Sequence, residues 1–141
     1  MPVRVVIDTS VFIAALRSRR GASFRLLSLV GGKLFSVCVS VPLMLEYEGA
    51  AKKVADELDL FQRDIDDVLD YLARVSEHRR VYFLWRPYLR DPRDDMLLEL
   101  AVEAECEFIV THNLRHFAGS ERFGVRVATP REFLRVIGEI R

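Results

Sequence analysis

The stretch RVVIDTSVFIAAL, residues 4–16, joins a hydrophobic run to an aspartate and two hydroxyl residues. Together with Val3, its first part predicts a buried strand over residues 3–7, and residues 11–16 predict a helix. Asp8 therefore lies where a strand gives way to a helix. Two interpretations follow. Asp8 either caps the helix by accepting hydrogen bonds from its free N–H groups, or it belongs to a metal or phosphate site at the carboxyl end of a strand, where open α/β sheets carry their chemistry.

Length and composition are those of an ordinary folded protein. The chain has 141 residues, of which 50% are hydrophobic and 30% are charged, and we expect residues 1–141 to form one domain. The longest nearly apolar run, residues 35–45, is too short and too polar to span a membrane, and the first residues do not resemble a secretory signal. Cys38 and Cys106 have apolar neighbours and no partner motif. We therefore expect a cytoplasmic protein with reduced cysteines.

Strand-like and helix-like segments alternate along the chain. Helices are predicted at residues 11–16, 23–30, 58–75, 94–104 and 130–137, with a further helix opened by Ser40 and Pro42. Strands are predicted at residues 3–7, 34–40, 81–85, 107–111 and 125–128. This alternation predicts an α/β fold, a three-layer α/β/α sandwich with a central parallel sheet of about five strands.

Four oxygen-bearing side chains map near the carboxyl ends of the predicted strands or the first turns of the following helices. They are Asp8, Glu46, Asp95 and Asn113. Hard oxygen ligands from several elements suit Mg²⁺ or Mn²⁺, and two carboxylates about 4 Å apart repel by roughly 4 kcal/mol unless a cation neutralises them. Each residue also has a simpler interpretation: Asp95 could cap a helix together with its acidic neighbours, Glu46 could be an exposed helix residue, and Asn113 could be a turn residue.

Several segments, taken in order, resemble the PIN domain family, most closely its VapC-type toxins of toxin–antitoxin systems. They are VVIDTSVFIAAL (5–16), SVPLMLEYEGA (40–50), RDPRDDMLLELAVEAECEFIVTHNLRHF (90–117) and VRVATPREFLRVI (125–137). The resemblance covers nearly the whole chain and implies a PIN-like fold. It also implies a Mg²⁺- or Mn²⁺-dependent endoribonuclease that hydrolyses RNA phosphodiester bonds, as the toxin of a toxin–antitoxin pair. The implied partners are an RNA substrate, a cognate antitoxin protein and a second copy of the chain in a homodimer.

The same resemblance implies a role for each matching residue. The metal ligands are Asp8, Glu46 and Asp95. The fourth catalytic position, often aspartate in the family, is Asn113, which leaves the number of metal ions at one or two. Supporting positions that orient ligands or waters, or act as an outer acid, are Thr9, Ser10, Asp94 and Thr111.

Arginines cluster just beyond the first predicted helix, at Arg17, Arg19, Arg20 and Arg25. They lie on the side from which a substrate would approach, so they are candidate contacts to RNA phosphates. A solvated charged face explains them equally well.

Other functions were weighed against the nuclease. A phosphatase that forms an aspartyl-phosphate would need an aspartate where Ser10 stands. A housekeeping RNA-processing nuclease, or a degenerate PIN domain that only binds RNA or a protein partner, would keep the same fold. His112 and His116 have a spacing found in zinc sites, but no third histidine or cysteine lies nearby in the sequence.

Overall fold

The structure, a computed structural model, describes residues 2–82 and 88–141 of the chain. At its centre is a five-stranded sheet with the strand order β3-β2-β1-β4-β5, in which all neighbouring strands are parallel. The strands are β1 (Val3–Ile7), β2 (Phe35–Val39), β3 (Glu77–His78), β4 (Phe108–Val110) and β5 (Arg126–Ala128). The predicted fold class is confirmed.

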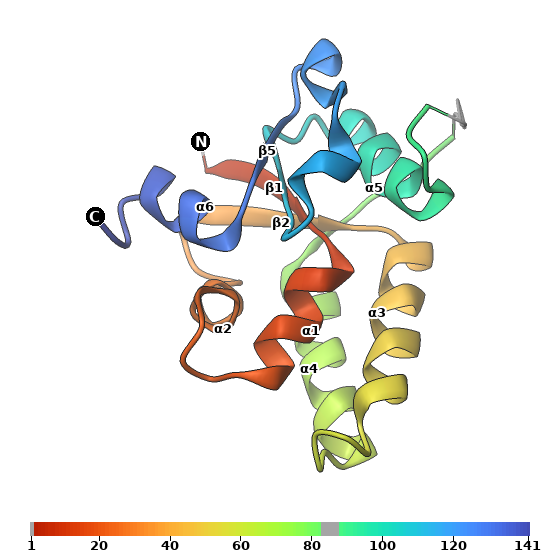
Figure 1. Ribbon diagram of the computed structural model, residues 1–141, viewed down its shortest axis with the longest axis vertical. Helices are drawn as coiled ribbons and strands as arrows, with labels where there is room; N and C mark the ends of the chain where they lie inside the picture. The colour runs from red at the N-terminus through yellow and green to blue at the C-terminus, as the bar shows by residue number, and fades with distance from the viewer. Residues whose placement is uncertain (1, 83–87) are drawn as a thin grey trace.

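Helices cover both faces of this sheet, and Figure 1 shows α1–α4 on one side of the strands and α5 on the other. The helices are α1 (Thr9–Arg17), α2 (Ala22–Ser28), α3 (Val41–Val54), α4 (Gln62–Val75), α5 (Pro92–Glu103) and α6 (Pro130–Val136). The chain moves from β1 toward β3 first and then returns past β1 to β4 and β5. Because crossovers between parallel strands are right-handed, this reversal places α5 on the opposite face from α1–α4.

The reversal makes the gap between β1 and β4 the switch point of the sheet. Ile7 pairs with Val110 in the register of these two strands, and the Asp8 N–H donates to the Val110 carbonyl at 2.9 Å. The residues that follow the two strands, Asp8 and Thr111, are therefore neighbours. A crevice outside the carboxyl ends of strands at such a point is where open α/β sheets bind ligands.

Tyr47 on α3 joins three elements beneath this crevice. Its ring is buried and stacks on Phe12 of α1 with 5.0 Å between the ring centroids. Its hydroxyl donates a hydrogen bond to the Ile7 carbonyl at the end of β1. This contact fixes α1 and α3 against the strand that carries Asp8.

The predicted third strand, residues 81–85, is wrong in its first part. The strand at this edge of the sheet is Glu77–His78, whereas Val81 and Tyr82 have no regular structure. Residues 83–87 lie outside the described part of the chain. The strand was not recognised because it is short and charged: Glu77 accepts from Arg4 at 3.1 Å and also from Arg79.

The amphipathic helix predicted at residues 58–75 begins later, at Gln62. The chain turns first, because Asp59 adopts a left-handed backbone conformation with φ of 58° and Leu60 N–H donates to the Ala55 carbonyl. Phe61, the N-cap residue of α4, is 66% exposed. Two short 3₁₀ helices, η1 (Leu114–Phe117) and η2 (Ser120–Phe123), also went unpredicted.

No helix within the described ranges combines the length and the apolar character needed to cross a membrane. Cys38 and Cys106 are both buried and neither forms a disulfide, as expected from the sequence.

Replacing Tyr47 by Phe should lower the free energy of unfolding by about 1–3 kcal/mol, because the buried Ile7 carbonyl loses its donor while the ring stack is kept. Urea unfolding followed by circular dichroism measures this loss. Tyr71→Phe is the matched control: its hydroxyl donates to the Val30 carbonyl at 2.7 Å, but Tyr71 is 43% exposed, so water can replace the bond. Equal losses in the two variants would contradict the role given to Tyr47.

Candidate metal-binding site at the switch point of the sheet

The structure tests the capping interpretation of Asp8. Asp8 occupies the N-cap position of α1, but its side chain accepts no capping hydrogen bond from a backbone N–H of the helix. Its Oδ2 instead accepts from Ser10 Oγ at 2.9 Å and from Thr111 Oγ1 at 2.6 Å. The capping interpretation is therefore wrong. Asp8, only 8% exposed, is held by one hydroxyl from α1 and one from the end of β4.

The loop after β4 is tied to the same corner. Asn113 N–H donates to Thr111 Oγ1 at 2.9 Å, and His112 N–H donates to Ser10 Oγ at 3.3 Å. Both hydroxyls that contact Asp8 bond to Oδ2, and Oδ1 has no hydrogen-bond partner among the residues that the structure describes. One carboxylate oxygen is thus fixed and the other is left for a ligand.

Glu46 projects from α3 toward the same corner. Burial raises the pKa of its carboxyl above the ordinary value, and the negative charge of Asp8 raises it further. The charge of Arg93 and the nearby Thr9 hydroxyl lower this pKa, yet within the described ranges the buried Thr9 hydroxyl has no hydrogen bond of normal geometry. A negative charge on Glu46 therefore lacks full compensation, and a buried donor beside it is unused.

Asp94 reaches the corner from the first turn of α5. Burial raises the pKa of Asp94 to about 6, and the charges of Asp8 and Asp91 contribute to the rise. His116 lies on the other side, with Nδ1 3.5 Å from Asp94 Oδ2, and it lowers the pKa. The negative charge of Asp8 thus acts on Asp94 across the crevice.

Asp95 has a different environment from its neighbour. Its carboxylate is fully buried and accepts hydrogen bonds from the backbone N–H groups of Leu89, at 2.8 Å, and Tyr88, at 3.3 Å. Successive residues on a helix point about 100° apart, so Asp94 and Asp95 cannot both face the crevice. The predicted role of Asp95 as a metal ligand does not agree with this placement, because its oxygens hold the loop before α5.

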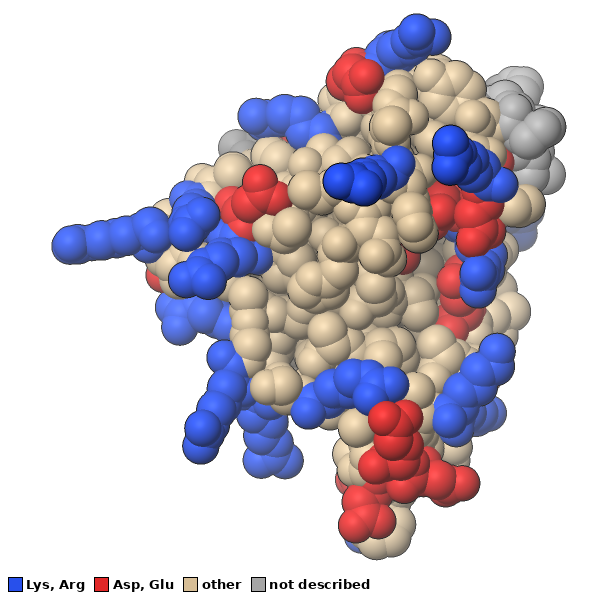
Figure 2. All heavy atoms as spheres, viewed as in Figure 1, with Lys and Arg blue, Asp and Glu red and all other residues tan. Residues whose placement is uncertain are grey.

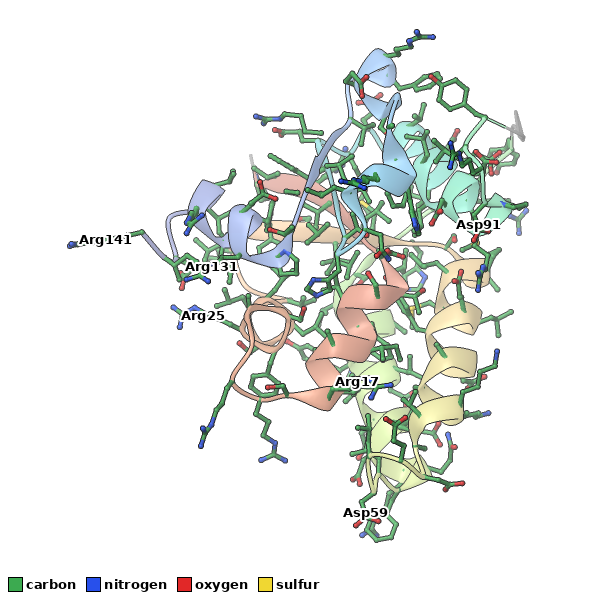
Figure 3. All side chains as sticks on the ribbon, viewed as in Figure 1. Arg17, Arg25, Asp59, Asp91, Arg131 and Arg141 are labelled. Atoms are coloured by element: carbon green, nitrogen blue, oxygen red, sulfur yellow. The ribbon has the colours of Figure 1, made fainter. Side chains whose placement is uncertain are left out.

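A hollow of about 600 Å³ collects the remaining acids. It is lined by the predicted residues Asp8, Thr9, Ser10, Glu46, Asp94 and Asn113, and also by Asp91, Arg93, Lys53 and His116. Figure 2 shows acidic side chains on the right-hand side of the molecule, flanked by basic ones, and Figure 3 places Asp91 there at the start of α5. The crevice therefore brings together six of the predicted site residues, and Thr111 supports it from below.

Arg93, Lys53 and His116 were absent from the predicted site. Arg93 Nη2 lies 3.1 Å from Asp91 Oδ2, and Asp91 also caps α5 by accepting from the Arg93 N–H at 2.9 Å, so capping is confirmed for this aspartate. The signal in the sequence was an arginine set between acidic residues in DPRDD. Its position at a helix start, facing the crevice, could not be read from the sequence.

The donor set fits a hard divalent cation in its chemistry. Asp8, Glu46 and Asp94 offer carboxylate oxygens and Asn113 an amide oxygen, the ligands that Mg²⁺ and Mn²⁺ prefer. The pKa values of Glu46 and Asp94 are raised, and the buried Thr9 hydroxyl beside them has no partner among the described residues. A bound cation would stabilise both carboxylates in their charged form. As the side chains stand, no group of three or more His, Cys, Asp or Glu residues in ranges 2–82 and 88–141 is arranged to hold an ion.

The four arginines predicted to bind RNA differ in their ion pairs, and the two histidines with zinc-site spacing contact different residues. Arg17 pairs with Glu57 at 2.7 Å and Arg25 with Glu139 at 3.0 Å, whereas the guanidinium groups of Arg19 and Arg20 have no ion-pair partner among the described residues. A role of these arginines in RNA binding stays a prediction. His112 contacts Ser23 and His116 contacts Asp94, so the two histidines have separate surroundings.

Replacing Asp94 by Asn should stabilise the metal-free protein at neutral pH. Because the folded-state pKa of about 6 exceeds the ordinary value of 3.8, the folded chain holds this proton more tightly and its stability falls as the pH rises through this interval. Asn does not titrate. The free energy of unfolding of the variant should therefore match that of the parent near pH 3.8 and exceed it above about pH 6. Urea unfolding in EDTA across this range of pH measures the difference.

Asp95→Asn is the matched control, since it removes the charge of the adjacent residue. Its carboxylate accepts two backbone N–H groups, so this variant should lose about 1–3 kcal/mol of unfolding free energy. Stabilisation of Asp95→Asn, or destabilisation of Asp94→Asn at neutral pH, would overturn the distinction between the two carboxylates.

Comparison with known proteins agrees with this fold. A family model described as PIN domain matches residues 4–115, and no curated protein sequence matches the chain. A chain in the crystal structure of VapBC2 from Rickettsia felis, bound to a DNA fragment from their promoter, is similar in fold, with a TM-score of 0.62 and 14% sequence identity over 89% of this chain and 98% of that chain. PIN domains are generally nucleases and typically depend on a divalent metal ion. The resemblance noted in the sequence is confirmed, and the chain belongs to the PIN domain family.

Proposed function

We propose that the chain is a Mg²⁺- or Mn²⁺-dependent endoribonuclease in which Asp8, Glu46 and Asp94 are the acidic metal ligands. One observation carries the proposal: carboxyls from α3 and α5 share a hollow with Asp8, and the charge of Asp8 raises the pKa of both. Structural ion pairs would lower these pKa values instead. Asp94 takes the part predicted for Asp95.

Asp8 is the fixed point of the proposed site. Thr111 and Ser10 donate to its Oδ2, and these two hydrogen bonds set the orientation of the carboxylate. Asp8 also lines the hollow, and Oδ1 is the oxygen that we assign to the metal ion. In metal sites, such hydrogen bonds to a ligand orient it and tune its basicity.

Glu46 and Asp94 close the site from two other elements, and Asn113 adds a neutral oxygen. When bound, a divalent cation supplies positive charge beside a phosphate and lowers the pKa of a water molecule. The Thr9 hydroxyl, which has no hydrogen-bond partner among the described residues, can donate to a water or a phosphate oxygen. Arg93 and Lys53 line the same hollow and add positive charge near an anionic substrate.

The reaction needs no nucleophile from the protein. A water oxygen forms a bond to phosphorus while the bond from phosphorus to the 3′ oxygen breaks. The attacking water gives up a proton and the leaving 3′ oxygen takes one up. The products are a 5′-phosphate and a 3′-hydroxyl.

Asp8→Asn and Asp94→Asn should each reduce RNA cleavage in Mn²⁺ by at least about 100-fold, a typical cost of losing a group that stabilises charge in a transition state. Gel analysis of a labelled single-stranded RNA measures the rate. Asp70→Asn removes one charge from an exposed position on α4 and should cut at the rate of the parent. Cleavage by Asp8→Asn at the parental rate would refute the proposal.

Calorimetric titration with Mn²⁺ separates a nuclease from a degenerate domain that only binds a partner. The parent should bind Mn²⁺ and gain thermal stability from it, and Asp8→Asn should lose both effects. A parent chain that neither binds Mn²⁺ nor cuts RNA would favour the degenerate domain.

We also propose that the nuclease acts in the cytoplasm as the toxin of a toxin–antitoxin pair, with a cognate antitoxin and a homodimeric assembly. The VapC-type sequence resemblance and the likeness in fold to VapBC2 support this. Induced expression in a bacterial host should then arrest growth, while Asp8→Asn should not. Unimpaired growth at high expression of a chain that is active in the test tube would favour a housekeeping nuclease.

A further inference from the structure

A second hollow, of about 610 Å³, lies between the turn after α1, α2 and α6. Four arginines line it, and they come from two distant parts of the sequence: Arg19, Arg20, Arg25 and Arg131. Among the described residues no aspartate or glutamate lines it. Figure 3 shows Arg25 and Arg131 projecting on the left of α2 and α6, and Figure 2 shows basic side chains gathered over this side of the molecule. We call it the basic hollow.

The charge of the basic hollow is poorly compensated. Arg25 pairs with Glu139 at 3.0 Å, whereas Arg19, Arg20 and Arg131 form no ion pair within residues 2–82 and 88–141. Some arginines elsewhere are paired with a carboxylate, as Arg17 is with Glu57. Like charges gathered in a concave surface repel each other, and an anion bound there relieves this repulsion.

The chemistry of the lining selects the kind of anion. Guanidinium groups bind phosphate oxygens through two parallel hydrogen bonds, and several of them at separate points suit a chain of phosphates better than a single ion. Phe24, which is 39% exposed, lines the hollow together with Leu134 and Ile140. An exposed aromatic ring in a hollow lined by cations, such as that of Phe24, suits base stacking by single-stranded nucleic acid.

The basic hollow is joined to the acidic one through α2. Ser23 of α2 is buried, and its Oγ lies 2.8 Å from His112 Nε2. His112 N–H donates to Ser10 Oγ, and both Ser10 and the next residue, Asn113, line the acidic hollow. The elements that carry the two hollows are therefore linked to each other by hydrogen bonds.

We propose that the basic hollow binds the phosphates of a single-stranded RNA at nucleotides beyond the one held in the acidic hollow. The inference deepens the proposed function and rests on it for the identity of the strand as a substrate. It makes the preferred substrate a strand of several nucleotides instead of a dinucleotide. Arg131, which sequence reasoning did not select, joins Arg19, Arg20 and Arg25 in this role, and Arg17 does not.

The test measures RNA binding without cleavage. In the Asp8→Asn background, Arg131→Glu and the double variant Arg19→Glu/Arg20→Glu should bind a labelled, unstructured RNA of about 12 nucleotides at least tenfold more weakly by fluorescence anisotropy. The slope of log affinity against log salt concentration should fall by about one for each phosphate that the variant no longer binds. Arg122→Glu on η2 has the same change of charge outside both hollows and is the matched control.

A second arm uses the active chain. Cleavage of the long RNA at low concentration should fall at least tenfold in the same variants, and cleavage of a dinucleotide should not change. If Arg131→Glu and Arg19→Glu/Arg20→Glu bind RNA as tightly as Arg122→Glu, the inference is overturned. It is equally overturned if they keep RNA binding but lose binding to vesicles containing anionic lipid.

The two proposals fail in different ways. A parent chain that binds RNA through these arginines but does not cut it in Mn²⁺ would contradict the nuclease and support the basic hollow as a nucleic-acid site. A chain that cuts dinucleotides and long RNA alike, with no effect of the arginine variants, would support the nuclease and overturn the basic hollow.

Discussion

The hydrogen bond from Thr111 Oγ1 to Asp8 Oδ2 is the contact on which the rest of the site depends. It joins the ends of β1 and β4, the two strands between which the sheet reverses its direction. Burying a polar group is costly unless it is hydrogen-bonded, so this donor stabilises the buried side chain of Asp8. With Asp8 fixed there, α3, which follows β2, and α5, which precedes β4, bring Glu46 and Asp94 to the same hollow. The strand order thus sets the position of the charge before any ligand is bound.

The chain compensates its acids unevenly, and the difference follows position. Arg17 lowers the pKa of Glu57 and Arg79 lowers that of Glu77. In the crevice the pKa values of Glu46 and Asp94 are raised. Arginines are plentiful in this sequence, so a lack of partners does not explain the contrast. Arg93 compensates these two carboxyls only in part, and perturbed carboxyls of this kind are typical of functional sites.

The fold and part of the candidate site could be predicted from the sequence, wherever a residue lies in or next to a segment with a clear hydrophobic pattern. The alternation of strands and helices was enough for the fold, and Asp8, directly after β1, could be placed at the edge of the sheet because its strand is unambiguous. The short strand at Glu77–His78 could not be predicted, because its residues have no apolar pattern. Glu77 instead pairs with Arg4 and Arg79. Arg131 escaped notice because α6 approaches α2 only in the folded chain.

The choice between Asp94 and Asp95 shows most clearly what sequence cannot resolve. Both belong to the first turn of α5, and both are acids that favour a helix start. Their separation of about 100° on the helix sends one toward Asp8 and the other into the protein, where it accepts the N–H groups of Leu89 and Tyr88. The hydrogen bonds of Asp95 fix the start of α5, and so they also fix where Asp94 points. The two adjacent acids therefore have dependent roles. Asp95 positions the start of α5, and α5 in turn positions Asp94, which lines the crevice.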